Sequence, residues 1–137
     1  MLGCKIDYAR NDVTPEVFLA VLKGDKDFVK GKGNGRVLET GPQDKIFVFF
    51  SDHGSVGLIA FPTKYLYATA MIPVLDEMAA KNRFDKFVFY LEACESGSMF
   101  TSLKTNTKIY ALSASSPDES SWGCYCNPED VNLQEVN

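Results

Sequence analysis

The sequence is poor in metal-binding groups and in positive charge. Its 137 residues contain one histidine and four cysteines. The cysteines, at positions 4, 94, 124 and 126, lack the spacing of a zinc site. The 14 Lys+Arg residues are outnumbered by 18 Asp+Glu residues, for a net charge of −4 without a basic stripe. We therefore expect no metal and no cofactor, and neither nucleic acid nor an anionic membrane as a partner.

Long apolar segments and targeting signals are also lacking. No stretch is long enough to span a membrane, and neither a signal peptide nor an Asn-x-Ser/Thr acceptor site is apparent. These features predict no membrane insertion. With 45% hydrophobic residues, a chain of this size buries about two thirds of its unfolded surface. We expect one domain over residues 1–137.

Two apolar runs predict buried parallel strands. Residues 46–50 and 87–91 are continuous runs of Ile, Val, Leu, Phe and Tyr, typical of strands covered on both faces. A third strand is expected over residues 108–113. The segment between the first two is long enough for one crossover helix. The pattern predicts an α/β fold with a mostly parallel sheet.

Two helices are expected to cover this sheet. The first has Thr14 as its N-cap and Pro15 at its first position, and Gly24 ends it. The second is predicted over residues 70–83, where apolar side chains recur at helical spacing. Its Pro73 is tolerable only near the first turn.

The strand ends carry the reactive groups. His53 follows the first run within Ser51-Asp52-His53-Gly54, and Cys94 follows the second within Glu92-Ala93-Cys94-Glu95-Ser96-Gly97-Ser98. Parallel neighbours open both loops on one sheet edge, where an imidazole can activate a thiol. The N–H groups of Gly54 and Cys94 are candidate oxyanion donors. The alternative is a surface histidine and a structural cysteine.

These segments resemble the legumain family of C13-type cysteine peptidases, also called asparaginyl endopeptidases or vacuolar processing enzymes. The segment Glu-Ala-Cys-Glu-Ser-Gly-Ser is specific to legumains. The resemblance implies a caspase-like, three-layer α/β/α sandwich with a mostly parallel sheet. It keeps the family's order over residues 12–25, 41–44, 51–54, 87–99 and 119–123.

The resemblance also assigns roles to residues. It makes Cys94 the nucleophile and His53 the general base, and it places Glu92, Ser120 and Ser121 in the pocket for a substrate Asn side chain. A carboxamide has both donor and acceptor atoms and needs a polar pocket, and such a pocket disfavours apolar side chains. Without the resemblance, Glu92 is a solvated acid and the serines are turn residues.

The segment after the third strand is expected to border the same sheet edge. Residues 114–137 are predicted to form a polar loop, in which Trp122 is either a wall of the substrate pocket or a packing residue. Cys126 resembles one half of a loop disulfide of plant-like legumains. Such a bond implies an oxidising compartment.

The resemblance predicts the extent and activity of the protein. Legumains carry a preceding strand and a later acidic pocket residue, so residues 1–137 are expected to be a partial catalytic domain, incomplete at both ends. The implied function is hydrolysis of peptide bonds after Asn, more weakly after Asp, in a vacuole or lysosome. The implied partners are peptides or proteins with exposed Asn, and a prodomain or cystatin-like inhibitor.

Two other interpretations stay open. In the first, the chain is an inactive homologue or fragment that serves only as a binding module. In the second, it is a caspase-like peptidase of different specificity or a transamidase. Coding sequence on either side that restores the missing segments would remove the first. Cleavage of peptides varied at the cleaved position would decide the second.

Overall fold

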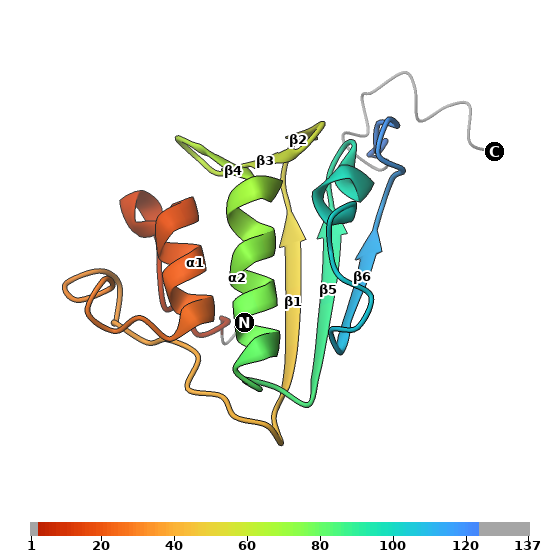
Figure 1. Cartoon of the computed structure of the whole chain (residues 1–137). Helices are drawn as coiled ribbons and strands as arrows, with labels where there is room; N and C mark the ends of the chain where they lie inside the picture. Colours follow the sequence, from red (N-terminus) through yellow and green to blue (C-terminus); the bar gives the residue numbers. More distant parts are fainter. Residues whose placement is uncertain (1–2, 124–137) are drawn as a thin grey trace.

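Three parallel strands form the centre of the fold in a computed structural model, which describes residues 3–123 (Figure 1). They are β1 (Lys45–Ser51), β5 (Lys86–Glu92) and β6 (Ile109–Ser113), in the spatial order β1-β5-β6. All neighbours are parallel. The three predicted strands and the mostly parallel sheet are therefore confirmed.

A small antiparallel sheet follows β1 and was not predicted. It consists of β2 (Gly54–Ser55), β3 (Leu58–Ala60) and β4 (Tyr65–Tyr67) in that order. Figure 1 shows it at the end of the molecule toward which β1 points. Strands this short carry no alternation that a sequence pattern can reveal. Because β2 begins directly after His53, this sheet shapes the end of β1.

Helix α1 follows the predicted capping pattern. It spans Pro15–Lys23, and the Thr14 side chain accepts a hydrogen bond from the Val17 N–H at 3.3 Å. Gly24 ends the helix in the left-handed conformation, with φ of +77°. The short 3₁₀ helix η1 (Arg10–Asp12) precedes it. The predicted start and end of α1 are confirmed.

Helix α2 is the crossover between β1 and β5, but its predicted boundaries were wrong. It spans Ala68–Ala80 rather than residues 70–83, because β4 leads directly into it and the chain turns at Asn82, whose φ is +50°. Pro73 lies inside the helix on an exposed position, so the carbonyl that it leaves unpaired can face water. Within residues 3–123, no helix combines the length and apolarity needed to cross a membrane.

The core lies between the helices and one face of the parallel sheet. Phe87 and Phe89 of β5 and Met71 and Leu75 of α2 are fully buried. Phe18 of α1 packs near Phe89, with ring centroids 6.4 Å apart. Burial of such a side chain contributes about 1.5–3 kcal/mol, so these residues hold β5 at the centre of the fold.

The opposite face of the parallel sheet is apolar but exposed. Alternate residues of a strand point to opposite faces, and the helices among the described residues cover only one of them (Figure 1). The second helical layer of the expected three-layer sandwich is therefore not found within residues 3–123. The exposed face carries five large side chains that are 38% to 62% exposed: Phe47, Phe49, Tyr90, Tyr110 and Leu112.

Arg83 joins the end of α1 to the loop that leads into β1. Its guanidinium donates hydrogen bonds to the carbonyls of Lys23 and Leu38, each at 2.6 Å, and of Thr40 at 3.1 Å. Such bonds are strong because the donor is charged. One side chain thus holds three backbone carbonyls, one at the end of α1 and two in the loop that leads into β1.

Replacing Arg83 with Met should lower the free energy of unfolding by about 2 kcal/mol. A hydrogen bond from a charged group contributes about 1.5–3 kcal/mol, and water compensates part of the loss at this half-buried position. Urea denaturation measures the change. Lys81→Met is the matched control, because it removes a positive charge from an exposed pair with Glu77 that contributes little to stability. Equal losses in the two variants would contradict the role of Arg83.

Candidate functional site

The register of β1 and β5 brings the predicted catalytic residues to the same sheet edge. Ser51 and Glu92 are the last pair of the ladder, and the Asp52 N–H extends it by donating to the Glu92 carbonyl at 3.2 Å. His53 and Cys94 each lie two residues beyond that last pair. Ligand sites of open parallel sheets form at this carboxyl edge.

His53 and Cys94 line one cleft of about 250 Å³. His53 is exposed and Cys94 is half-buried. Predicted site residues Glu92 and Ser121 line the same cleft, whereas Ser120 and Trp122 do not. The full lining is Ser51, Asp52, His53, Glu92, Ala93, Cys94, Ser121 and Gly123.

The backbone of His53 is fixed on both sides. Its N–H donates to the Asp52 Oδ1 at 2.6 Å, and its carbonyl accepts from the Ala60 N–H of β3 at 2.8 Å. The His53 side chain therefore extends from a point that is anchored to the small antiparallel sheet.

Gly54 is required for a close approach of the two loops. A Cβ at this position would overlap the carbonyl oxygen of Cys94 and lie 3.0 Å from the Ala93 Cβ. The residue after His53 thus packs directly on the backbone of the nucleophile candidate. This contact explains why glycine stands here, whereas its role as an oxyanion donor stays a prediction.

Cys94 is followed by a constrained turn. Glu95 adopts the left-handed conformation with φ of +48°, which is uncommon for residues other than glycine. The Cys94 Sγ donates to the Ser121 carbonyl at 3.6 Å. Only the protonated thiol can donate, so this contact must be released before a thiolate can attack.

Buried serines hold this turn against the segment after β6. The Ser115 Oγ donates to the Ala93 carbonyl at 3.0 Å and accepts from the Ser96 N–H at 3.2 Å, while the Ser115 N–H donates to the Ser96 Oγ at 3.2 Å. Both serines are buried, where an unsatisfied polar group is costly. Sequence reasoning missed their burial, because the neighbours of these serines in the sequence are mostly small or polar and give no sign of it.

Glu92 and Ser121 form a polar pair inside the cleft. The Ser121 Oγ donates to the Glu92 Oε1 at 2.7 Å. Ser120 instead donates to the Glu95 Oε1 at 3.4 Å, outside the cleft. Trp122 is 89% exposed, so it is neither a packing residue nor a wall of the cleft in this structure. The pair offers an acceptor and a hydroxyl to a bound amide.

The described cysteines and acids show no metal-binding cluster. Within residues 3–123, no group of three or more His, Cys, Asp or Glu side chains is placed to hold an ion. Cys4 and Cys94 are free thiols. The predicted loop disulfide of Cys126 lies outside the described residues.

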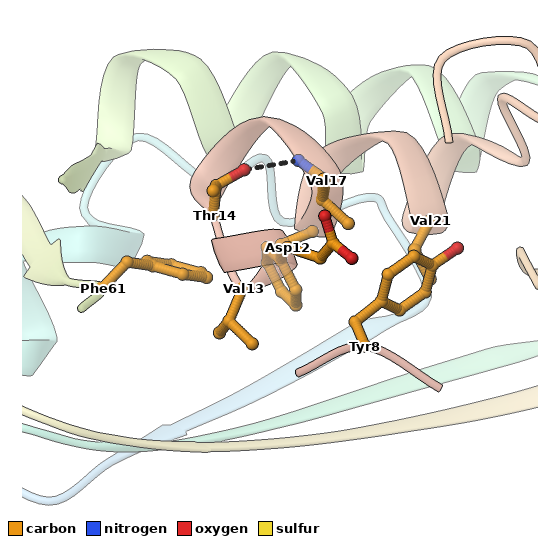
Figure 2. Close-up of a pocket in the computed structure, with 8 residues that line it drawn as sticks. Tyr8, Asp12, Val13, Thr14, Val17, Val21 and Phe61 are labelled. Carbon is orange, nitrogen blue, oxygen red and sulfur yellow. Dashed lines mark hydrogen bonds between the residues drawn. The ribbon is translucent and has the colours of Figure 1, made fainter. Parts of the chain in front are cut away.

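A second cavity, of about 240 Å³, lies between the N-terminal segment and α1 (Figure 2). Its polar groups are already used: the Tyr8 hydroxyl donates to the Arg36 carbonyl at 2.6 Å, and the Asp12 Oδ2 accepts from the Gly33 N–H at 2.8 Å. Burial raises the pKa of Tyr8, as do the carboxylates of Asp7 and Asp12. Neither a thiol nor an imidazole lines this cavity. Its remaining lining is Val13, Thr14, Val17, Phe18, Val21 and Phe61.

Comparison with known proteins shows similarity over nearly the whole chain. The Peptidase C13 family matches residues 1–134. The chain is 47% identical over 127 residues to "Legumain" of Rattus norvegicus, covering 93% of this chain and 29% of that protein. It is 48% identical over 123 residues to "Legumain" of Homo sapiens, covering 90% and 28%. It is also 48% identical over 129 residues to "Vacuolar-processing enzyme" of Citrus sinensis, covering 93% and 26%. The chain thus spans less than a third of the length of these curated relatives.

Replacing Gly54 with Ala should lower the free energy of unfolding by about 1–3 kcal/mol, the usual cost of overpacking. The added methyl group must push the loop of His53 away from the Cys94 carbonyl. Gly41→Ala is the matched control, because a Cβ at Gly41 meets no atom within 4 Å, and it should change stability by less than about 0.5 kcal/mol. Denaturant unfolding compares the two, and equal stabilities would contradict the close approach.

Proposed function

Because the chain belongs to the Peptidase C13 family, we propose that it carries the catalytic pair of a cysteine endopeptidase that hydrolyses peptide bonds after Asn and, more weakly, after Asp. The observation that carries this proposal is the common cleft of His53 and Cys94 at the ends of two paired strands. The relatives named legumain and vacuolar-processing enzyme support it.

The proposed reaction begins with proton transfer from the Cys94 thiol to the His53 imidazole. The thiol leaves its contact with the Ser121 carbonyl, and the thiolate attacks the scissile carbonyl carbon. The N–H groups of Gly54 and Cys94 stabilise the oxyanion. His53 then protonates the leaving amine, and the thioester is released by water, or by an incoming amine in a ligation.

Specificity is assigned to the pair of Glu92 and Ser121. The Glu92 carboxylate accepts from the amide NH₂ of a substrate Asn, and the Ser121 hydroxyl donates to the amide oxygen. In the structure, the Ser121 hydroxyl donates its proton to Glu92 at 2.7 Å. The Ser121 side chain must therefore rotate when the substrate binds. Ser120 and Trp122 take part only if their segment moves onto the substrate.

The proposed substrates are peptides or proteins with exposed Asn residues, and the proposed setting is a vacuole or lysosome. The setting rests on the name of the Citrus sinensis relative, which refers to vacuolar processing. Inhibition by a prodomain or a cystatin-like protein stays a prediction.

Cys94→Ala and His53→Ala in the full-length protein should each lower kcat on an Asn-containing peptide by at least about a thousandfold, because loss of either member of a nucleophile and base pair removes most of the chemistry. Peptide cleavage at mildly acidic pH, with a thiol reductant, is the measurement. Cys4→Ala is the matched control, since Cys4 is the other free thiol among the described residues, and it should cleave as the wild type does.

Covalent labelling separates the chemistry from a loss of folding. An electrophilic peptide ending in Asn should label Cys94 in the wild type and in Cys4→Ala, and the label should be lost in His53→Ala. Intact-mass analysis and peptide mapping locate it. Full cleavage by Cys94→Ala, or labelling only elsewhere, would contradict the proposal.

Glu92→Gln should lower the ratio of kcat/KM for an Asn peptide to kcat/KM for an Asp peptide about tenfold. The variant removes the negative charge that repels a substrate carboxylate. Matched Asn and Asp peptides are compared at pH 6, where the substrate Asp is ionised. Glu119→Gln, which changes an exposed acid that does not line the cleft, should leave the ratio unchanged. An unaltered ratio in Glu92→Gln would contradict the role of Glu92 in substrate specificity.

A further inference from the structure

Ser98 joins the two loops that carry His53 and Cys94. It lies in the 3₁₀ helix η2 (Ser96–Phe100), four residues after Cys94, and its side chain is 6% exposed. Its hydroxyl accepts a hydrogen bond from the Gly57 N–H at 2.8 Å and donates to the Glu95 carbonyl at 2.5 Å. One oxygen atom therefore contacts the turn between β2 and β3 and the turn after Cys94.

The direction of both hydrogen bonds is determined by chemistry. The Gly57 N–H can only donate and the Glu95 carbonyl can only accept, so the single hydroxyl proton of Ser98 must point toward Glu95. The Glu95 carbonyl also accepts from the Ser98 N–H at 2.9 Å. Ser98 thereby holds Glu95, whose φ is +48°, through its backbone and its side chain together.

Gly57 is a rigid point of the hairpin that begins after His53. It forms the turn between β2 and β3 with Val56, at φ of +73°, and its carbonyl accepts from the Ala68 N–H at the start of α2 at 2.9 Å. The same hairpin holds the His53 carbonyl through Ala60. A shift of Gly57 relative to Ser98 is therefore passed to His53.

We propose that Ser98 is a positioning residue that sets the His53 loop against the Cys94 turn through its bridge between Gly57 and Glu95. This inference rests on the proposed function. The contact of Gly54 with the Cys94 carbonyl limits how closely the loops approach, and the Ser98 bridge prevents them from separating. Ser98 is not among the residues that line the cleft, so its effect on catalysis is transmitted through the two loops.

The test compares Ser98→Ala, Ser98→Thr and Thr101→Ala in the full-length protein. Thr101 is the matched control, because its hydroxyl bonds only to the Ser98 carbonyl, at 3.2 Å, and not to the hairpin. The readouts are kcat and KM on an Asn peptide, and the rate of Cys94 alkylation by iodoacetamide between pH 5 and 9. The alkylation rate of each variant is also measured in the His53→Ala background.

Ser98→Ala should lower kcat about 30- to 100-fold with KM changed less than about twofold, since a small misplacement of reacting groups costs about a hundredfold. Ser98→Ala should also abolish the difference in Cys94 alkylation rate at pH 6 between proteins with and without the His53 side chain. Ser98→Thr, which retains the hydroxyl, should recover most of the rate, and Thr101→Ala should behave as the wild type.

Several outcomes would overturn the proposal. The proposal fails if Ser98→Ala has the kcat and the alkylation rate of the wild type. It also fails if Ser98→Ala and Thr101→Ala lose equal amounts of kcat, because equal losses would indicate a general structural effect. If wild-type alkylation does not depend on His53, the proposed function itself fails and the positioning role with it. If Ser98→Ala does not fold, the test is the rate of hydrogen exchange of the Gly57 amide in the wild type. Slow exchange supports the Ser98 bridge, and exchange at the rate of an open loop overturns it.

Discussion

The pairing register of β1 with β5 determines where the groups of the candidate site lie. Side chains alternate between faces, so a slip by one residue would turn the core residues of β1 to the exposed face and move His53 away from Cys94. The fully buried Phe87 and Phe89 of β5 oppose such a slip, because β5 has a neighbour on each side and packs on α2. The same burial that stabilises the sheet thereby places the thiol and the imidazole at one edge.

Beyond the strands, short polar contacts replace apolar packing. Gly54 allows the His53 loop to rest on the Cys94 carbonyl, and Ser98 and Ser115 satisfy the backbone of the turn that follows Cys94. Buried hydroxyls of this kind specify geometry more narrowly than apolar contacts, because each has few partners and an unpaired one is costly. Rigid positioning of a nucleophile and its base requires this form of support.

The sequence predicts the large elements of this fold and misses the small ones. The runs at β1 and β5 and the Thr-Pro start of α1 carry strong local signals, so their places were predictable. The strands β2 to β4 have two or three residues each, which is too short for a periodic pattern. The apolar runs also suggested that both faces of β1 and β5 are covered, yet Phe47 and Tyr90 are exposed, since periodicity does not reveal which segment covers a face. Burial of Ser98 depends on the hairpin and could not be predicted from its neighbours.

A structure of the full-length protein with an electrophilic Asn peptide bound covalently would test the central claim most directly. The account predicts a bond to the Cys94 Sγ, the His53 imidazole within hydrogen-bond distance of that sulfur or of the leaving-group position, and the Asn carboxamide between Glu92 and Ser121. An adduct on another residue, or a Cys94 adduct whose Asn side chain points away from Glu92 and Ser121, would contradict it.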